Sequence, residues 1–166
     1  MAKVYGFNRE NRKGREIITV LDVASAMLTF ESMPHKKLQK LCYYTYAWFL
    51  TFYGEHLFSG LFEAWIHGPV HPDLYQVYKE NGWKPIDQVS RDSLTNISAE
   101  TYEFLGIIYG SYGGLTGDEL EAVTHDEEPW TEARGGLPEY EPSQNPINED
   151  TIIRFYKGVS ERAQTE

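Results

Sequence analysis

The sequence predicts a mainly α-helical (α+β) protein, a compact single-domain bundle of about six helices with a small β-hairpin or extended arm. Three observations predict this class. Apolar residues recur at i, i+3, i+4 and i+7 in several segments, which is the spacing of one helix face. Capping residues stand at the starts of these segments. The chain has 166 residues, of which 41% are hydrophobic and 14% aromatic, and this suits one domain with a buried core better than a disordered chain.

Two helices are predicted in the first third of the chain. Thr19 can cap a helix whose apolar positions run from Val20 to Leu28. Pro34 suits the first turn of the strongest helix in the chain, which extends to Gly54, a natural C-terminal stop.

The two halves of this second helix differ in polarity. Four polar residues of its first turns are expected on the outside: His35, Lys36, Lys37 and Lys40. From Tyr43 onward the helix is apolar nearly all round, so we expect its second half to be the central, enclosed element of the fold. The lysines oppose the helix macrodipole at a cost of about a few tenths of a kcal/mol each where exposed, and such a placement can serve binding.

A small hairpin or extended arm is predicted over residues 55–69. This segment has no helical stripe, and residues 59–60, Ser-Gly, provide a turn between two short apolar runs. Gly68 permits a backbone turn that a side chain would block, and Pro69 bars a helix. Trp65, just before this bend, is expected to pack inward.

A third helix is predicted to begin at Pro72 and to end at residues 81–82, Asn-Gly. Its expected inward positions are Leu74, Val77 and Tyr78.

Two further helices are indicated by their capping residues. Ser98 can cap a helix whose apolar stripe ends before Gly113. Thr116 and Glu119 then form an S/T-x-x-E capping box, which is the clearest helix start in the sequence.

The last part of the chain is predicted to hold two helices separated by a loop. Trp130 lies in a short helical turn after Pro129, and residues 135–136, Gly-Gly, end that turn. The proline-rich stretch 137–146 has no period and is expected to be a surface loop. Asn148 can cap a final helix.

The charge distribution divides the chain into a domain and two tails. The net charge of −10 opposes non-specific attraction to nucleic-acid phosphates, but residues 1–16 carry +3. Residues 1–18 are therefore predicted to be a basic arm outside the domain 19–160. This arm either frays into solvent or touches an acidic partner or nucleic acid. Residues 161–166 are expected to fray.

The apolar segments and the single cysteine predict the compartment. No run of about 18 apolar residues is present, and the N-terminus lacks the apolar centre of a secretory signal. Cys42, the one cysteine, lies in an apolar segment and is expected to be a buried thiol. We expect a cytoplasmic protein that does not contact a membrane.

Two histidines, His67 and His71, raise the question of a metal site. Residues four apart share one side of the chain only in a helix, which residues 68–69, Gly-Pro, forbid. A zinc ion would also need His125 and carboxylates such as Asp126. The alternative is that His67 hydrogen-bonds a nearby turn and His71 caps or flanks the helix that Pro72 begins. We expect no metal and no cofactor.

The stretch "THDEEPW", residues 124–130, could supply a general base, because His125 stands beside three acids. Sequence neighbours rarely face one another, however, and nothing marks a nucleophile, a phosphate loop or a pair of spaced carboxylates. We therefore expect a helix-to-helix corner in which Trp130 plugs the core. No catalytic residue and no enzyme activity are predicted.

Three motifs together resemble the Panacea domain, the family that contains SocA-like antitoxins and phage GepA-type proteins. The Leu-x-Lys-Leu helix of the family corresponds to residues 38–41, its Trp-x-x-Gly-Pro-Val corner to residues 65–70, and its Thr-His-x-Glu-x-Pro-Trp run to residues 124–130. Three successive acids, residues 126–128, precede Pro129 here, and which of them carries the role of the family acid is open. The structural motif positions are Leu38, Leu41, Trp65, Gly68, Pro69, Pro129 and Trp130.

The resemblance covers about residues 20–134 and implies a mostly helical domain, encoded next to a toxin in many bacteria and phages, that neutralises the toxin by direct binding. A SocA-like member delivers its toxin to a protease as an adaptor. The predicted function is therefore that of an antitoxin of a toxin–antitoxin system, with a cognate protein toxin encoded by a neighbouring gene as partner. The aromatic-rich composition is compatible with docking a protein.

Two other functions stay open. One is a proteolytic adaptor or a regulatory phage or prophage protein, which would bind a protease or, through the basic arm, nucleic acid; the core itself is not expected to bind nucleic acid. The lesser one is a metal-dependent hydrolase. The residues predicted to contact the toxin are Lys37, Lys40, His67, His71, His125 and Glu128.

Overall fold

The computed structural model describes residues 17–165, so the predicted basic arm 1–18 lies almost entirely outside the described residues. Within the described part the chain forms seven α-helices and one small antiparallel sheet, which confirms the predicted mainly α-helical class. The helices are α1 (Val20–Met27), α2 (His35–Tyr53), α3 (Pro72–Tyr78), α4 (Ala99–Tyr112), α5 (Gly117–His125), α6 (Glu128–Arg134) and α7 (Glu149–Thr165). The strands are β1 (Glu63–Trp65) and β2 (Gly68–Val70), and two 3₁₀ turns are Lys79–Asn81 and Arg91–Ser93. No helix within residues 17–165 is both long enough and apolar enough to cross a membrane.

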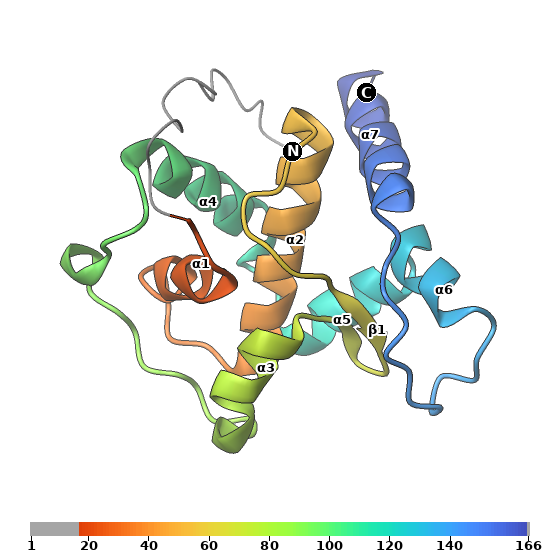
Figure 1. Ribbon diagram of the computed structural model, residues 1–166, viewed down its shortest axis with the longest axis horizontal. Helices are drawn as coiled ribbons and strands as arrows, with labels where there is room; N and C mark the ends of the chain where they lie inside the picture. Colours follow the sequence, from red (N-terminus) through yellow and green to blue (C-terminus); the bar gives the residue numbers. More distant parts are fainter. Residues whose placement is uncertain (1–16, 166) are drawn as a thin grey trace.

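Helix α2 is the central element of the molecule (Figure 1), as its apolar second half predicts. Helices α1, α3, α4, α5 and α7 and strand β2 all contact it. Every residue of α2 from Lys37 to Leu50 is buried. Gly54 ends the helix in the left-handed region with φ +66°, a conformation that glycine adopts without strain.

The first turns of α2 correct the expectation that its lysines lie on the outside. Lys37 and Lys40 are buried, with relative exposures of 7% and 1%. The pattern failed because α5 and β2, which are distant in sequence, also pack on α2. His35 and Lys36 are partly exposed.

The predicted capping residues begin their helices as expected. Thr19 forms a capping box at the start of α1, and Thr116 forms another with Glu119 at the start of α5. Ser98 accepts a hydrogen bond from the Thr101 amide at the start of α4. At the start of α7, the Thr151 amide donates to Asn148 Oδ1 at 3.1 Å.

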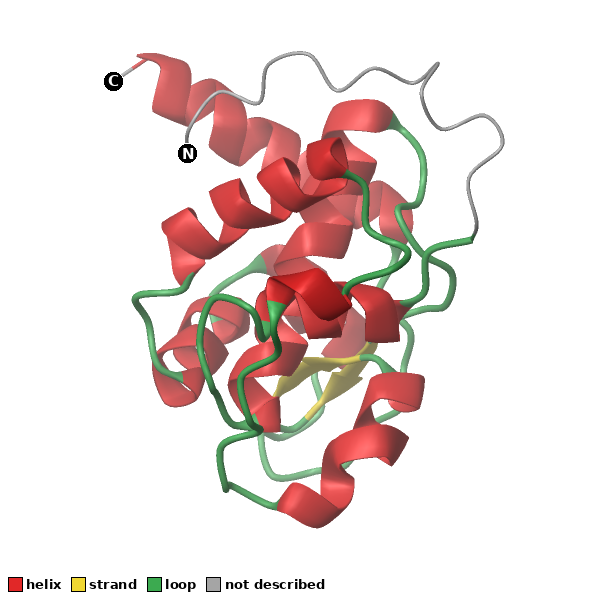
Figure 2. Cartoon of the chain, turned by 90° about the vertical axis from the view of Figure 1, so that its left-hand side faces the viewer, coloured by secondary structure: helices red, strands yellow, loops and turns green. Residues whose placement is uncertain are grey.

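The β-hairpin is present, but its turn lies at residues 66–67 and not at residues 59–60. Trp65 pairs with Gly68 at the turn end of the ladder. Gly68, the first residue after this turn, adopts φ +106°, a conformation that glycine adopts without strain. Figure 2 shows the two strands enclosed among helices and loops.

Two predicted inward side chains point outward. Trp65 is only half-buried, because alternation along β1 places Ala64 in the core. Val77 on α3 is 52% exposed, whereas Leu74 of the same helix is fully buried. Helix α3 has one buried residue and is covered on one side only.

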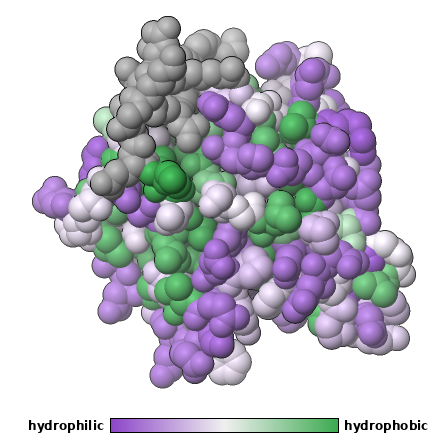
Figure 3. Space-filling view, in the orientation of Figure 1, coloured by the Kyte–Doolittle hydropathy of each residue, from purple (hydrophilic) through white to green (hydrophobic). Residues whose placement is uncertain are grey.

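Helix α7 completes the core with one apolar face. Ile152 and Tyr156 are fully buried, and the helix packs on α2 and α6. Hydrophilic side chains predominate over α7 on the face shown in Figure 3. The helix continues to Thr165, through most of the segment 161–166 that the sequence predicts to fray.

Candidate partner-binding groove

An open groove of about 1110 Å³ lies between the start of α2, the hairpin, the end of α3 and the start of α5. We refer to it as the groove. Its apolar lining includes Trp65, Tyr75 and Trp83. The rings of Trp65 and Tyr75 pack edge to face with centroids 4.8 Å apart, and Trp83 is 88% exposed. Residues 142–144 of the proline-rich loop also line the groove.

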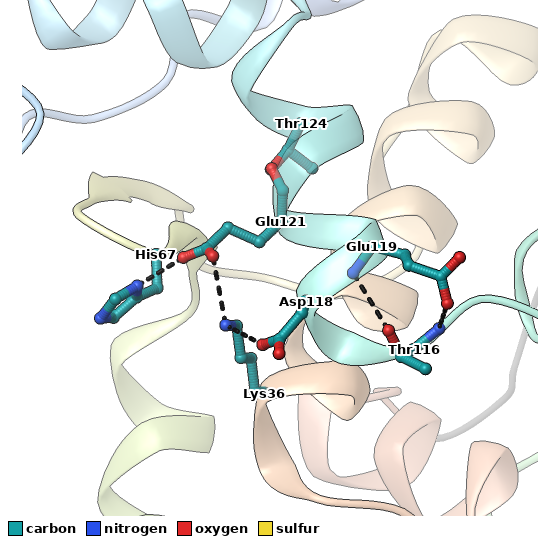
Figure 4. A network of polar contacts seen from close by, with 7 residues as sticks. All are labelled: Lys36, His67, Thr116, Asp118, Glu119, Glu121 and Thr124. Atoms are coloured by element: carbon teal, nitrogen blue, oxygen red, sulfur yellow. Dashed lines mark hydrogen bonds and ion pairs between the residues drawn. The ribbon is translucent and has the colours of Figure 1, made fainter.

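A network of charged side chains lies along the α5 side of the groove (Figure 4). Lys36 Nζ lies 2.6 Å from Asp118 Oδ1 and 3.2 Å from Glu121 Oε2. The other oxygen of Glu121 bonds His67 Nδ1. Partial burial of Lys36 opposes its charge, but its hydrogen bonds to the two carboxylates raise its pKa. The network ties α2, the hairpin turn and α5 together.

Lys40 is buried at the inner side of the groove. Its Nζ donates to the carbonyl oxygen of Pro69 at 3.3 Å. A Cβ at Gly68 would lie 2.4 Å from Lys40 Cε, so only glycine leaves room for this side chain. The pKa of Lys40 is lowered from 10.5 to about 7, mainly by burial and to a smaller extent by the nearby charge of Lys36, with a partial offset from Glu121.

The three sequence motifs meet around this amine. Lys40 belongs to the first motif, and Gly68 and Pro69 belong to the second. Thr124 of the third motif places its Oγ1 2.9 Å from the position of a Gly68 Cβ, on the same side as Lys40. Leu38 and Leu41, which flank Lys40, are fully buried in the core.

The third motif also forms a hydrogen bond to the hairpin through Trp130. Trp130, which is 6% exposed, donates from Nε1 to the Trp65 carbonyl at 2.9 Å. The ring of His125 stacks on Trp130 with centroids 3.9 Å apart. Pro129 occupies the first turn of α6 and is buried. The predicted helix-to-helix corner with Trp130 in the core is therefore present.

The structure does not bring the six predicted toxin-contacting residues onto one face. Lys40 and His67 line the groove, whereas the other four residues do not. Lys37 Nζ donates to Glu31 Oε1 at 2.6 Å and to the Gly113 carbonyl at 2.7 Å. Their contact with a toxin stays a prediction.

The two histidines around the hairpin turn have separate partners, and the ring of His67 bonds a residue of α5 and not the nearby turn proposed for it. His67 bonds Glu121, whereas His71 is buried and its Nε2 lies 3.1 Å from the Ser59 carbonyl. His71 precedes the first residue of α3, as expected. Gln39 forms two hydrogen bonds with the backbone of His71: its Oε1 accepts from the His71 amide at 2.9 Å, and its Nε2 donates to the His71 carbonyl at 3.1 Å.

The structure separates the acids of the third motif. Glu127 is partly buried and accepts hydrogen bonds from Tyr44 Oη at 2.7 Å and Tyr156 Oη at 3.0 Å. Burial raises its pKa to about 7, although both hydroxyl donors lower it. Glu128, the acid chosen from the sequence, is exposed and lies 2.7 Å from Arg154 Nη2. Glu127 is therefore the acid of this motif that belongs to the core.

Sequence reasoning missed two residues that shape the groove. The exposure of Trp83 could have been predicted, because this tryptophan directly follows Gly82 in a polar connector and belongs to no apolar helix face. The role of Glu121 could not have been predicted, because its contacts with Lys36 and His67 depend on packing between segments that are distant in sequence.

The helical fold and the three converging motifs define a small domain of the Panacea type. The chain belongs to the family described as "Antitoxin SocA-like, Panacea domain", which matches residues 38–131, more than half of the chain. A curated relative, "Antitoxin SocA" from Caulobacter vibrioides (strain NA1000 / CB15N), is 33% identical over 98 residues. The match covers 53% of this chain and 52% of that relative, so the chain spans about half the length of the relative that it matches. No solved structure matches the chain.

Proposed function

We propose that this protein is an antitoxin that neutralises a cognate protein toxin by direct binding, without catalysis. Family membership and the name of the Caulobacter relative support the general function. The neighbouring gene is the proposed source of the toxin, because the family resemblance implies that arrangement.

The observation that carries direct binding is the groove with its exposed tryptophan. An indole that is 88% exposed beside a concave, mostly apolar surface is costly to hydrate and gains free energy when a partner covers it. Tryptophan and tyrosine are enriched among the residues that dominate protein–protein binding energies. Trp65, Tyr75 and Trp83 thus supply an anchoring wall of the expected composition.

The charge of the chain supports association with a basic toxin. A net charge of −10 increases the encounter rate with a cationic partner at low salt, and the effect weakens as salt screens it.

Co-expression tests the proposal. The adjoining reading frame is induced in a host cell alone, with the wild-type chain, and with the Trp83→Asp variant, which places a charge on the groove wall. We expect growth arrest by the frame alone, rescue by the wild-type chain, and reduced rescue by the variant at equal protein level. A frame that is harmless by itself, or a toxic frame that the wild-type chain neither rescues nor binds in gel filtration, contradicts the proposal.

A further inference from the structure

Lys40 is a buried amine whose hydrogen-bonding capacity is largely unused. Its side chain is 1% exposed, and an ammonium group carries three N–H donors. One of these donates to the Pro69 carbonyl, at a long 3.3 Å. Among the described residues no carboxylate lies within ion-pair distance of this amine.

The amines of the two neighbouring lysines of α2 each have two hydrogen-bond acceptors. Lys36 bonds two carboxylates, and Lys37 bonds Glu31 and a backbone carbonyl at 2.6 and 2.7 Å. Lys40 is at least as buried as Lys37, but within residues 17–165 its amine has only the single weak acceptor. A buried cation without a counter-ion destabilises the free protein, so its placement points to a partner that supplies one.

The charges around the groove favour an acidic group as that counter-ion. The titratable groups that face Lys40 are His35 and Lys36 from α2 and Glu121 and His125 from α5. Glu121 already bonds Lys36 and His67, and β2 offers only its backbone. Among the described residues that line the groove, Asp118 is the one carboxylate beside four basic side chains, in a chain of net charge −10. The groove is thus a local exception to the acidic character of the protein.

The size and openness of the groove favour a protein segment over a metabolite. Its volume of about 1110 Å³ exceeds the range of about 300–1,000 Å³ that is typical of small-ligand sites. Its exposed wall of Trp65 and Trp83 suits a side chain that arrives from a folded partner.

We propose that the groove binds a segment of the cognate toxin that places an apolar side chain against the Trp65–Tyr75–Trp83 wall and a carboxylate on Lys40. This inference rests on the proposed antitoxin function and names the chemistry of the toxin surface that is recognised. The arriving carboxylate adds an acceptor for the amine and gives its protonated form a counter-ion. Hydrophobic contact at the wall supplies affinity, and the ion pair supplies selectivity for the correct toxin.

Proton uptake accompanies this binding mode. In the free chain the amine loses its proton near neutral pH, whereas an adjacent carboxylate holds the proton on the amine to higher pH. The complex therefore takes up a proton around pH 8, and affinity falls as the pH rises from 7.5 to 9.5. Burial lowers the pKa of His35 and of His125 below the ordinary histidine value, so these two groups do not change charge over this range, whereas Lys40 does.

The test measures the affinity of the purified full chain for the purified product of the adjoining reading frame by calorimetry, at pH 7.5 to 9.5 and in two buffers of different ionisation enthalpy. Lys40→Met removes the charge and keeps the length of the side chain. Lys157→Met removes the same charge from the exposed face of α7 and is the matched control. Trp83→Ala tests the wall without disturbing the core, because Trp83 is 88% exposed.

We expect Lys40→Met to weaken binding at least about 30-fold at pH 7.5 and to abolish the proton uptake. We expect Trp83→Ala to weaken binding about tenfold and Lys157→Met to change it less than about twofold. Thermal unfolding checks that Lys40→Met stays folded. A tight wild-type complex that takes up no proton, or that Lys40→Met leaves unchanged, overturns this inference and leaves the antitoxin function standing. Absence of a wild-type complex contradicts the proposed function itself, and this inference with it.

Discussion

Replacing Lys40 by methionine tests the energetic cost of the buried amine in the free chain. The unfolded chain keeps this proton up to about pH 10.5, whereas the folded chain loses it near pH 7. Between these values the folded chain binds fewer protons, so this residue makes folding stability rise with pH. Lys40→Met removes that contribution and retains most of the apolar volume of the side chain.

The magnitude follows from the two pKa values. The full interval corresponds to on the order of 5 kcal/mol, because each pKa unit is worth about 1.4 kcal/mol. About 3 kcal/mol of this falls between pH 7 and pH 9.5. The stability gained by Lys40→Met over the wild type is thus expected to be about 3 kcal/mol larger at pH 7 than at pH 9.5, whatever the fixed cost of the lost Pro69 hydrogen bond.

Urea unfolding followed by circular dichroism at several pH values measures this difference. Lys157→Met, on the exposed face of α7, controls for the change in net charge and should follow the wild-type curve. Parallel stability curves for the wild type and Lys40→Met would show that the amine is well solvated or paired, and would refute the argument.

Three further predictions concern elements that position the groove. Burial raises the pKa of Glu127 to about 7, so between pH 4.5 and pH 7 the folded chain binds more protons than the unfolded chain and the wild type loses about 3 kcal/mol of stability as the pH rises. Glu127→Gln should abolish this loss, as measured by the unfolding midpoint at several pH values. A loss that persists in the variant contradicts the assignment. Gly68→Ala should destabilise the chain by about 3 kcal/mol in urea unfolding, because φ is +106° and the added Cβ meets Lys40 Cε. Adding Lys40→Ala should restore part of this stability. No restoration would show that the strain lies in the backbone alone. Thr116→Ala should cost about 1 kcal/mol through loss of the capping box; urea unfolding measures this cost, and an unchanged free energy of unfolding would contradict the capping role.

The helices were predictable because their signals are local. The boxes at Thr19 and Thr116, and the stops at Gly54 and Gly135, depend on residues within one or two turns of each helix end. The position of the hairpin turn was wrong because a Ser-Gly pair and an Ile-His pair before Gly68 compete on equal local terms. Both glycines adopt a positive φ and lie against another side chain, Gly60 against His71 and Gly68 against Lys40. The two sites differ in the strand pairing of residues 63–65 with residues 68–70, which forms only in the folded chain.

The groove could be predicted only in part. The three motifs identify the residues that converge on Lys40, but a charge in a helix pattern is ordinarily assigned to solvent. The burial of Lys37 and Lys40 arises from α5 and β2, which join the first turns of α2 only in the folded chain. The partly buried Glu127 carries the internal contacts of the third motif, whereas the exposed Glu128 stays a predicted toxin contact.

Hydrogen–deuterium exchange of the full chain, with and without the purified product of the adjoining reading frame, tests the central claim most directly. We expect slower exchange in the complex over the hairpin residues 63–70, around Trp83 and at the start of α5, with little change over the outer face of α7. Protection confined to α7, or no protection anywhere in the chain, would contradict it.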